Sequence, residues 1–323
     1  MRRLSADFID HLQLDVVLQE EVAAWRNQIP PEPWVAAVRS KSADTVTWIQ
    51  SRLAAGANGL PSVVVNTRKA TMGTRPVPIL GIADRIVYRA LTKHVLSDLT
   101  VPDRSPDAYK AFLHGPIEYA FRDEHGPVWN VFGLDVKYVV EADITAFYQY
   151  IDHDLLRHEL ELHTGHIEAI DALFELLGET EGRIFGLPQL LDASDWLSDI
   201  YIQSVERDLL RRGLAVWRYN DDFRIACRSY TEALDAIERL SEAARAVGLT
   251  VSEYKTFTPS FPTYFFRTTG RDVNVALVDI DPSDVDVIVT DYPDLDDEER
   301  IEAAVWRGSI STRTMTTAST FIA

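Results

Sequence analysis

Three aspartates could do chemistry together. Asp143 closes the strand-like run KYVVEAD, and Asp221 and Asp222 are neighbours within LAVWRYNDDFRIACR (214–228). Adjacent carboxylates repel each other unless something positive lies between them. Mg²⁺ takes carboxylate oxygens as ligands, and two such ions about 3.5–4 Å apart can act on the attacking and leaving oxygens of a phosphoryl transfer. The trio is therefore compatible with a two-metal site. For Asp221 and Asp222 alone, the alternative is a solvated turn.

The elements that must position these aspartates follow from the residue pattern. Residues 214–228 are expected to form two strands joined by a tight turn at Tyr219–Asp222, because after the turn Phe223, Ile225 and Cys227 alternate with Arg224, Ala226 and Arg228. Residues 137–144 indicate another strand, and a helix that is capped by Asp152 is expected to begin at His153. A strand end and a neighbouring hairpin tip can present three carboxylates on one sheet edge.

Apolar periodicity predicts further helices, over about 5–25, 44–54, 81–99, 168–178, 192–212 and 229–248. Ser229 and Glu232 have the spacing of a capping box for the last of these helices. A strand is expected to begin at residues 63–65. Residues 100–137, which carry four prolines, are expected to be mixed and loop-rich.

Composition limits the class of protein. The 323 residues are 46% hydrophobic, which is ample for a packed core, and no apolar run is long enough to cross a bilayer. A single cysteine, Cys227, excludes an internal disulfide framework and a cysteine-rich zinc site, so a cytoplasmic location is expected. The net charge of −18 is unusual for a protein that grips nucleic acid. Any nucleic-acid groove must then be a local basic patch, unless a basic partner or a further segment provides the contacts with the phosphates.

Several segments resemble those of bacterial reverse transcriptases from group II introns, retrons and phage-defence systems. They occur in the family's order and approximate spacing over roughly residues 60–260: RPVPILGIADRIVYRAL (75–91), EADITAFYQYIDHDLL (141–156), GLPQ (186–189), YNDD (219–222) and GLTVSEYKT (248–256). The resemblance implies an α+β fold, the right-hand polymerase palm and fingers, in which helices pack on an antiparallel palm sheet.

The resemblance also implies catalytic roles. Asp143, Asp221 and Asp222 match the metal-binding acidic residues, which would hold two Mg²⁺ ions for which Mn²⁺ can substitute. Lys255 matches the lysine that protonates the departing pyrophosphate, and the alternative is a surface lysine.

Four residues are implied to bind the deoxynucleoside triphosphate. Tyr148 matches the aromatic gate that crowds a ribose 2′-hydroxyl, and Gln189 matches a residue that lies against the incoming nucleotide. Arg75 and Lys69 resemble the fingers cations that hold the triphosphate. The alternatives are a core aromatic for Tyr148, a plain loop glutamine for Gln189, and solvated surface charges for Arg75 and Lys69.

The chain departs from the family pattern at several points. Leu190 stands where the family usually has glycine, and SPDAYKAF (105–112) and TYFFRTTG (263–270) replace two other familiar elements. No HNH nuclease motif, maturase thumb or cysteine-rich finger occurs within these residues, which with the acidity argues against an intron maturase. Asp152 and His153 are expected to be structural. A helical surface is the expected location of three further histidines, His158, His163 and His166, rather than a metal cluster.

The resulting hypothesis has four parts along the chain: an N-terminal helical extension (1–55), fingers (56–137), palm (138–270) and an acidic C-terminal segment (271–323). A short helix is expected near 295–307, and that last segment is expected to start a truncated thumb. The predicted function is Mg²⁺-dependent, RNA-templated DNA synthesis from dNTPs in antiphage defence. The predicted partners are an RNA template or non-coding RNA, the DNA product, and a second copy or another protein, but no membrane. Two alternatives stay open: template-independent or protein-primed synthesis, and a catalytically inactive RNA-binding scaffold.

Overall fold

The computed structural model describes residues 1–24, 32–68, 74–122, 131 and 133–269. Its α-helices are α1 Ala6–His11, α2 Leu14–Ala23, α3 Val35–Ser40, α4 Ser42–Ala55, α5 Ile82–Val95, α6 Pro106–Ala120, α7 His153–Thr164, α8 Ile167–Glu181, α9 Asp192–Arg211, α10 Tyr230–Ala246 and α11 Phe261–Thr269. Its strands are β1 Val63–Arg68, β2 Thr74–Ile79, β3 Tyr138–Asp143, β4 Ala215–Tyr219 and β5 Asp222–Cys227, and its 3-10 helices are η1 Phe147–Gln149 and η2 Glu253–Lys255. The chain is a mixed α/β protein with two small antiparallel sheets.

The larger sheet has three antiparallel strands in the order β3-β5-β4. Phe223, Ile225 and Cys227 of β5 are fully buried, which accounts for the alternation seen in the sequence. β4 and β5 form a hairpin in which Tyr219 pairs with Asp222. The predicted hairpin over 214–228 and the predicted strand over 137–144 are both confirmed.

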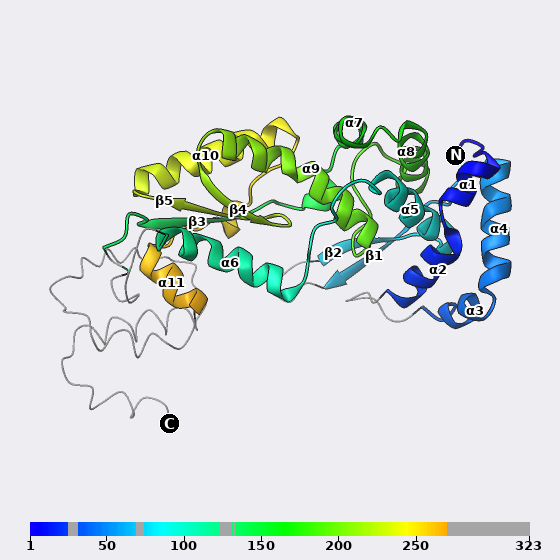
Figure 1. Cartoon of the computed structure of the whole chain (residues 1–323), viewed down its shortest axis with the longest axis horizontal. Helices are drawn as coiled ribbons and strands as arrows, with labels where there is room; N and C mark the ends of the chain where they lie inside the picture. The colour runs from blue at the N-terminus through cyan, green and yellow to red at the C-terminus, as the bar shows by residue number, and fades with distance from the viewer. Residues whose placement is uncertain (25–31, 69–73, 123–130, 132, 270–323) are drawn as a thin grey trace, which may run out of the picture.

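Helices cover both faces of this sheet. α10 packs on β5 and β3, while α6 packs on β4 and β5 from the opposite side (Figure 1). The Ser229 side chain caps α10 by accepting a hydrogen bond from the Glu232 amide, as the capping box predicts. The Glu232 carboxylate accepts instead from the amide of Arg228, one residue before the cap. The capping box therefore forms with its second bond shifted by one residue.

The helix predicted over 5–25 is wrong in its continuity, because α1 and α2 are separate helices. Gln13 lies between them with a φ of +47°, in the left-handed region. Leu12 and Leu14 on either side are both buried. Two residues that are two positions apart face different directions on a continuous helix, so the break at Gln13 allows both leucines to reach the core.

The smaller sheet is a hairpin of β1 and β2 (Figure 1). The strand expected from Val63 is confirmed, but its partner β2, which contains two prolines, was not predicted. Pro76 and Pro78 pair with Asn66 and Val64. Residues two apart in a strand direct their amides to the same side, and proline, which has no N–H, is tolerated at a sheet edge. A two-stranded sheet provides such an edge.

The prediction of a mixed, loop-rich segment over residues 100–137 missed α6, which occupies Pro106–Ala120. Ser105 caps this helix, and Pro106 lies in its first turn, where a missing N–H costs nothing. Phe112 and Ile117 are buried. Prolines in this segment therefore start or interrupt a helix that tertiary packing stabilises.

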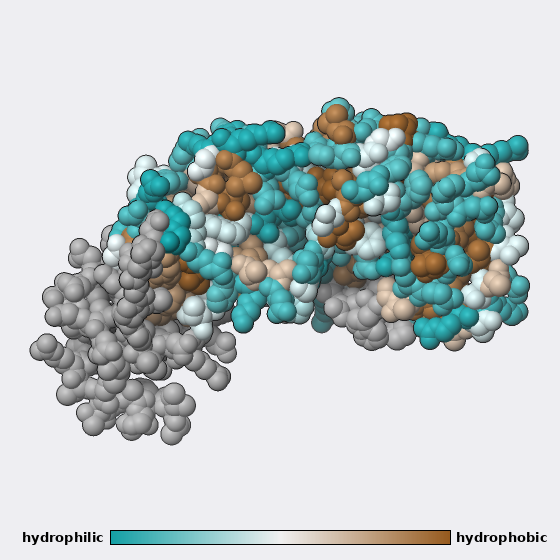
Figure 2. All heavy atoms as spheres, in the orientation of Figure 1, coloured by the Kyte–Doolittle hydropathy of each residue, from teal (hydrophilic) through white to brown (hydrophobic). Residues whose placement is uncertain are grey.

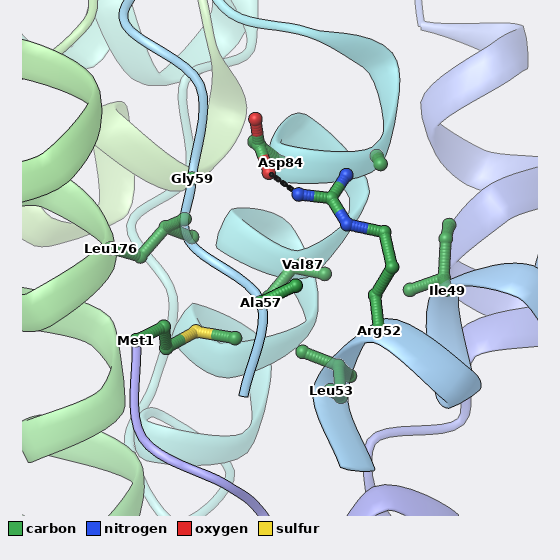
Figure 3. A pocket seen from close by; sticks show the side chains of 10 residues that line it. Met1, Ile49, Arg52, Leu53, Ala57, Gly59, Asp84, Val87 and Leu176 are labelled. Carbon is green, nitrogen blue, oxygen red and sulfur yellow. Dashed lines mark hydrogen bonds and ion pairs between the residues drawn. The ribbon is translucent and has the colours of Figure 1, made fainter. Parts of the chain in front are cut away.

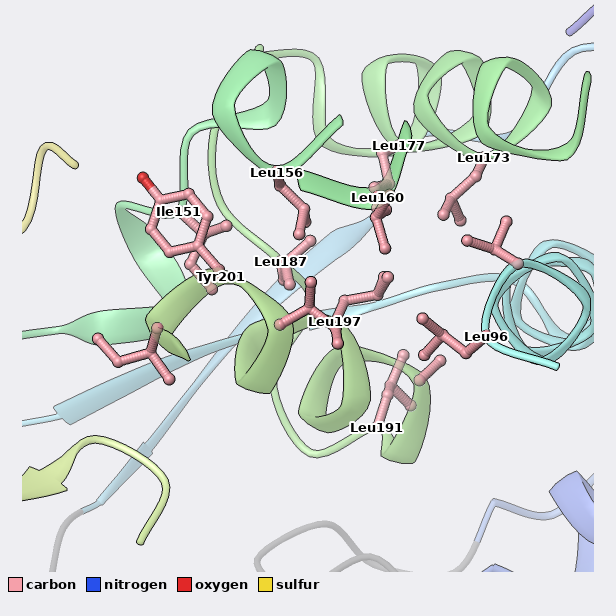
Figure 4. Packing of buried hydrophobic residues seen from close by; sticks show 14 of the residues in the cluster. Leu96, Ile151, Leu156, Leu160, Leu173, Leu177, Leu187, Leu191, Leu197 and Tyr201 are labelled. Carbon is pink, nitrogen blue, oxygen red and sulfur yellow. The ribbon is translucent and has the colours of Figure 1, made fainter. Parts of the chain in front are cut away.

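Most of the remaining helices pack around one apolar core. The helices expected over 44–54, 81–99, 168–178 and 192–212 are confirmed within a few residues of their ends. Figure 4 shows side chains from several elements meeting in this core, among them Leu96, Leu156, Leu173 and Leu197. Hydrophilic residues cover most of the face seen in Figure 2.

Some of the predicted features fall outside the described part of the chain. Lys69, the acidic segment 271–323 and the helix expected near 295–307 lie outside the described residues. Within the described part of the chain, no helix combines the length and the apolar character needed to cross a membrane.

Candidate active site

The sheet brings the three aspartates to one edge. Asp143 ends β3 and pairs in register with Asp222, which begins β5. Asp221 lies in the turn directly before Asp222, and its carbonyl accepts a hydrogen bond from the Ile144 amide at 3.2 Å. Backbone pairing therefore places residues about 80 positions apart in the chain at a single strand end.

Contacts with α9 hold the turn that carries Asp221 in place. Asn220 has a φ of +57°, which asparagine tolerates better than most residues. Its carbonyl accepts from Arg218 Nη1 at 3.1 Å. The buried Arg218 guanidinium also forms ion pairs with Asp199 and Glu206 of α9, each at 2.8 Å. The hairpin tip is thus fastened to α9 by a charged network.

Lys255 contacts Asp143 from the segment that follows α10. Its Nζ donates to Asp143 Oδ2 at 2.7 Å. The Ser252 amide donates to the Asp143 carbonyl at 2.8 Å, and Ile144 forms a bridge with Val251. Phe257 forms a second isolated bridge, with Glu141, and η2 lies between the two bridges.

The electrostatics of the site show crowded negative charge. Burial, together with the carboxylates of Asp143 and Asp222, raises the pKa of Asp221 to about 7. Burial also raises the pKa of Asp222, although Arg224 opposes the rise. Burial would lower the pKa of Lys255, but its hydrogen bond to Asp143 and the neighbouring carboxylates raise it overall. Positive charge at this edge would relieve the repulsion.

The chemistry of these residues fits a hard divalent cation. Their donors are carboxylate oxygens, which Mg²⁺ prefers, and burial together with the neighbouring carboxylates raises the pKa of Asp221. However, among the described residues no group of three or more His, Cys, Asp or Glu side chains is arranged to hold a metal ion. The Asp143 carboxylate is bonded to Lys255 instead. The backbone places the donors together, while their side chains are not arranged as a closed metal site.

Tyr148 lies beside the same hairpin tip. The backbone turns sharply at Ala146, with a φ of +49°, and η1 follows. The Tyr148 hydroxyl donates to Asp195 Oδ1 at 2.5 Å and, more weakly, to Asn220 Oδ1 at 3.4 Å. The structure therefore brings Tyr148 to the turn that holds Asp221. Its role as a sugar gate stays a prediction.

Gln189 lies in the loop before α9, and this loop is tied to the Tyr148 segment. The Leu187 amide donates to the Tyr148 carbonyl at 2.7 Å. Leu190, which replaces the family's usual glycine, has a φ of +64°. The backbone thus adopts a conformation that favours glycine although a leucine occupies the position.

The two cations predicted to hold the triphosphate are Arg75 and Lys69. Arg75 lies on β2, opposite Thr67. Lys69 lies outside the described residues. Their contact with a triphosphate stays a prediction.

Asp152 and His153 have the structural surroundings that were expected. The Asp152 side chain caps α7 by accepting from the amides of Asp154 and Leu155, each at 2.9 Å. Buried His153 contacts the Gly186 carbonyl through Nε2 at 2.8 Å. His163 and His166 belong to separate groups, with Glu159 and Asp98 respectively.

Sequence reasoning missed Arg104, Asp195 and Arg218. Arg104 lies in the segment expected to be loop-rich, and nothing in its neighbourhood signals a role. Asp195 and Asp199 are four residues apart and therefore share a face of α9. This spacing of two acids, on a helix that packs on the core, was the available signal that Asp195 and Asp199 have partners inside the protein.

The pocket in Figure 3 belongs to a different part of the molecule. Arg52 and Asp84 form an ion pair there at 3.4 Å, among apolar residues of α4, α5 and α8. The Leu60 amide also donates to Asp84 at 2.9 Å. These bonds explain how a buried carboxylate is satisfied, and the pocket shares no lining residue with the aspartate edge.

The chain matches a known protein family over most of its described residues. The family model for reverse transcriptase (RNA-dependent DNA polymerase) matches residues 67–264, which is more than half of the 323-residue chain. The match includes the three aspartates, Tyr148 and Lys255. No curated protein matches the chain.

Proposed function

Because this chain belongs to the reverse transcriptase family, we propose that it catalyses Mg²⁺-dependent, RNA-templated DNA synthesis from dNTPs. We assign residues 138–270 to a palm, 56–137 to fingers and 1–55 to a helical extension. The proposed setting is bacterial antiphage defence. The net charge of −18 disfavours direct binding of a large structured RNA by this chain alone, and it supports RNA binding with the help of a partner.

A single observation carries the catalytic proposal. Asp143 and Asp222 are register partners, and Asp221 precedes Asp222 in the turn. Three carboxylates at one strand end are costly unless cations neutralise them, as the raised pKa of Asp221 indicates. A site of this kind is expected where function requires a metal.

Each proposed residue has a distinct task. Asp143, Asp221 and Asp222 would hold Mg²⁺, which when bound supplies charge stabilisation to the attacking 3′-oxygen and the departing pyrophosphate. Lys255, whose pKa is raised beside Asp143, stays protonated at neutral pH and can donate a proton to the pyrophosphate. The Tyr148 ring would crowd a ribose 2′-hydroxyl and so favour deoxynucleotides.

The test is dNTP incorporation by Asp222→Asn and Asp143→Asn variants on an RNA template with an annealed primer. Both substitutions keep the side-chain volume but remove a charged ligand, so we expect incorporation to fall by about 100-fold or more. Asp235→Asn is the matched control, because Asp235 forms only an exposed ion pair with Arg239 on α10. Unchanged incorporation in the first two variants would contradict the assignment. A wild-type protein that binds RNA but incorporates nothing would indicate a scaffold.

A second candidate function is template-independent synthesis, and Leu190 is the observation that favours it. A leucine with a left-handed backbone next to Gln189 places a side chain where the family usually has none. Contacts with the template base pair could therefore differ. Sequencing the product separates the two functions, because copied DNA maps to the supplied template and untemplated DNA does not.

A further inference from the structure

The Tyr148 hydroxyl is the centre of a polar network that the sequence did not suggest. It donates to Asp195 Oδ1 at 2.5 Å and accepts from Arg104 Nη1 at 3.1 Å. Arg104 Nη1 also lies 3.2 Å from Asp195 Oδ1. An O–H···O⁻ bond of this length is charge-assisted and stronger than a neutral hydrogen bond.

Arg104 is itself fixed by several bonds. Its Nη2 donates to the Asp195 carbonyl at 2.7 Å and to Ser198 Oγ at 3.4 Å. Its own carbonyl accepts from the Tyr219 hydroxyl at 3.0 Å. Tyr219 ends β4, just before the turn that carries Asp221. Arg104 therefore connects the Tyr148 segment, α9 and the hairpin.

The same face of α9 also holds the hairpin tip. Asp195 binds Tyr148, and Asp199, one turn later, binds Arg218 at 2.8 Å. Arg218 in turn donates to the Asn220 carbonyl at 3.1 Å. One rigid helix thus sets the distance between the Tyr148 ring and the aspartate turn.

The network is partly exposed to solvent. The side chains of Arg104 and Asp195 keep 24% and 29% of their exposure. A tyrosine ring without its hydroxyl bonds can rotate among side-chain rotamers. Steric exclusion of a single oxygen atom requires the ring to stay in place.

We infer that Asp195 and Arg104 are positioning residues that hold the Tyr148 ring through its hydroxyl and thereby set the discrimination between deoxyribose and ribose. This inference rests on the proposed function, in which Tyr148 faces the sugar of the incoming nucleotide. Neither residue needs to touch the nucleotide, because the effect passes through the tyrosine.

The experiment measures kcat/KM for a dNTP and for the rNTP of the same base in five variants. Tyr148→Phe keeps the ring and removes the hydroxyl, while Asp195→Asn keeps the volume and removes the charge. We expect each to lower the dNTP/rNTP ratio by about tenfold, in line with the loss of one charge-assisted bond. The change should arise from faster rNTP use, with dNTP kcat kept within a few-fold. Arg104→Gln should act in the same direction, and Arg104→Lys should restore part of the ratio.

The control is Asp208→Asn, which changes a partly exposed carboxylate on the same helix, paired with Arg212, and should leave the ratio unchanged. Melting temperatures measured in parallel identify any loss of folding. Preserved ratios in both Tyr148→Phe and Asp195→Asn, with dNTP incorporation intact, would overturn the inference alone. A wild-type enzyme that incorporates no dNTP would overturn the proposed function, and the inference with it.

Discussion

Replacing Asp221 by asparagine should stabilise the metal-free protein at neutral and higher pH although it abolishes the proposed activity. The causes are the burial of Asp221 and its position beside two other carboxylates, Asp143 and Asp222, at the end of β3 and β5. Burial and these neighbours raise its pKa from the ordinary 3.8 to about 7. Such a site stores repulsion that a bound cation would relieve.

The sign of the pH dependence follows from proton binding. Between about pH 4 and pH 7, Asp221 is ionised in the unfolded chain but keeps its proton in the native protein. The native state therefore binds more protons, and its stability falls as the pH rises through this window. Above about pH 7 the native group is also ionised, and the loss is complete.

The magnitude can be bounded from the same shift. A pKa raised from 3.8 to about 7 corresponds to about 4 kcal/mol as an upper limit. Asp221 is half-buried rather than fully buried, so water screens part of the repulsion. We expect Asp221→Asn to be more stable than the wild type by about 1–2 kcal/mol at pH 8, and by much less at pH 5.

The assay is urea unfolding in the presence of a chelator at several pH values, with Asp235→Asn as the surface control. Adding Mg²⁺ to the wild type should recover stability, because a ligand that binds only the native state stabilises it. The Asn variant should gain less. A variant that is less stable than the wild type at pH 8, or a difference that does not change with pH, would refute the reasoning.

Three further predictions concern other positions. In urea unfolding, Leu190→Gly should be more stable than Leu190→Ala by about 1 kcal/mol. Both variants lose the leucine side chain, but only alanine retains the strain of a φ of +64°. Equal stabilities of the two variants would contradict this. Gly115→Ala should destabilise the protein by about 1–3 kcal/mol and lower its melting temperature, since an added Cβ would lie 2.3 Å from Trp217 Cδ1. An unchanged melting temperature would show that the indole moves freely. Lys255→Ala should reduce single-turnover incorporation by about 100-fold if its ammonium group donates the proton, and a rate within twofold of the wild type would exclude that role.

Local sequence was a good guide wherever neighbouring residues decide the structure. The YNDD hairpin, the Asp152 cap and the Ser229 cap were predicted because turn and capping bonds join residues only two to four positions apart. Two elements that contain prolines, α6 and β2, were not predicted. Pro106 begins α6 and Pro76 lies on a sheet edge, and both are positions where a missing N–H is harmless.

The sequence by itself determined the types and order of the candidate catalytic residues. It also determined the strand that ends at Asp143 and the hairpin whose turn carries Asp221. Only the tertiary structure decided what surrounds them. Arg104, Tyr148 and Asp195 come from three separate segments, and no local periodicity relates them. Their contacts exist because the packing of α9 against the sheet sets these distances, and such packing depends on the whole apolar core rather than on any short stretch of the chain.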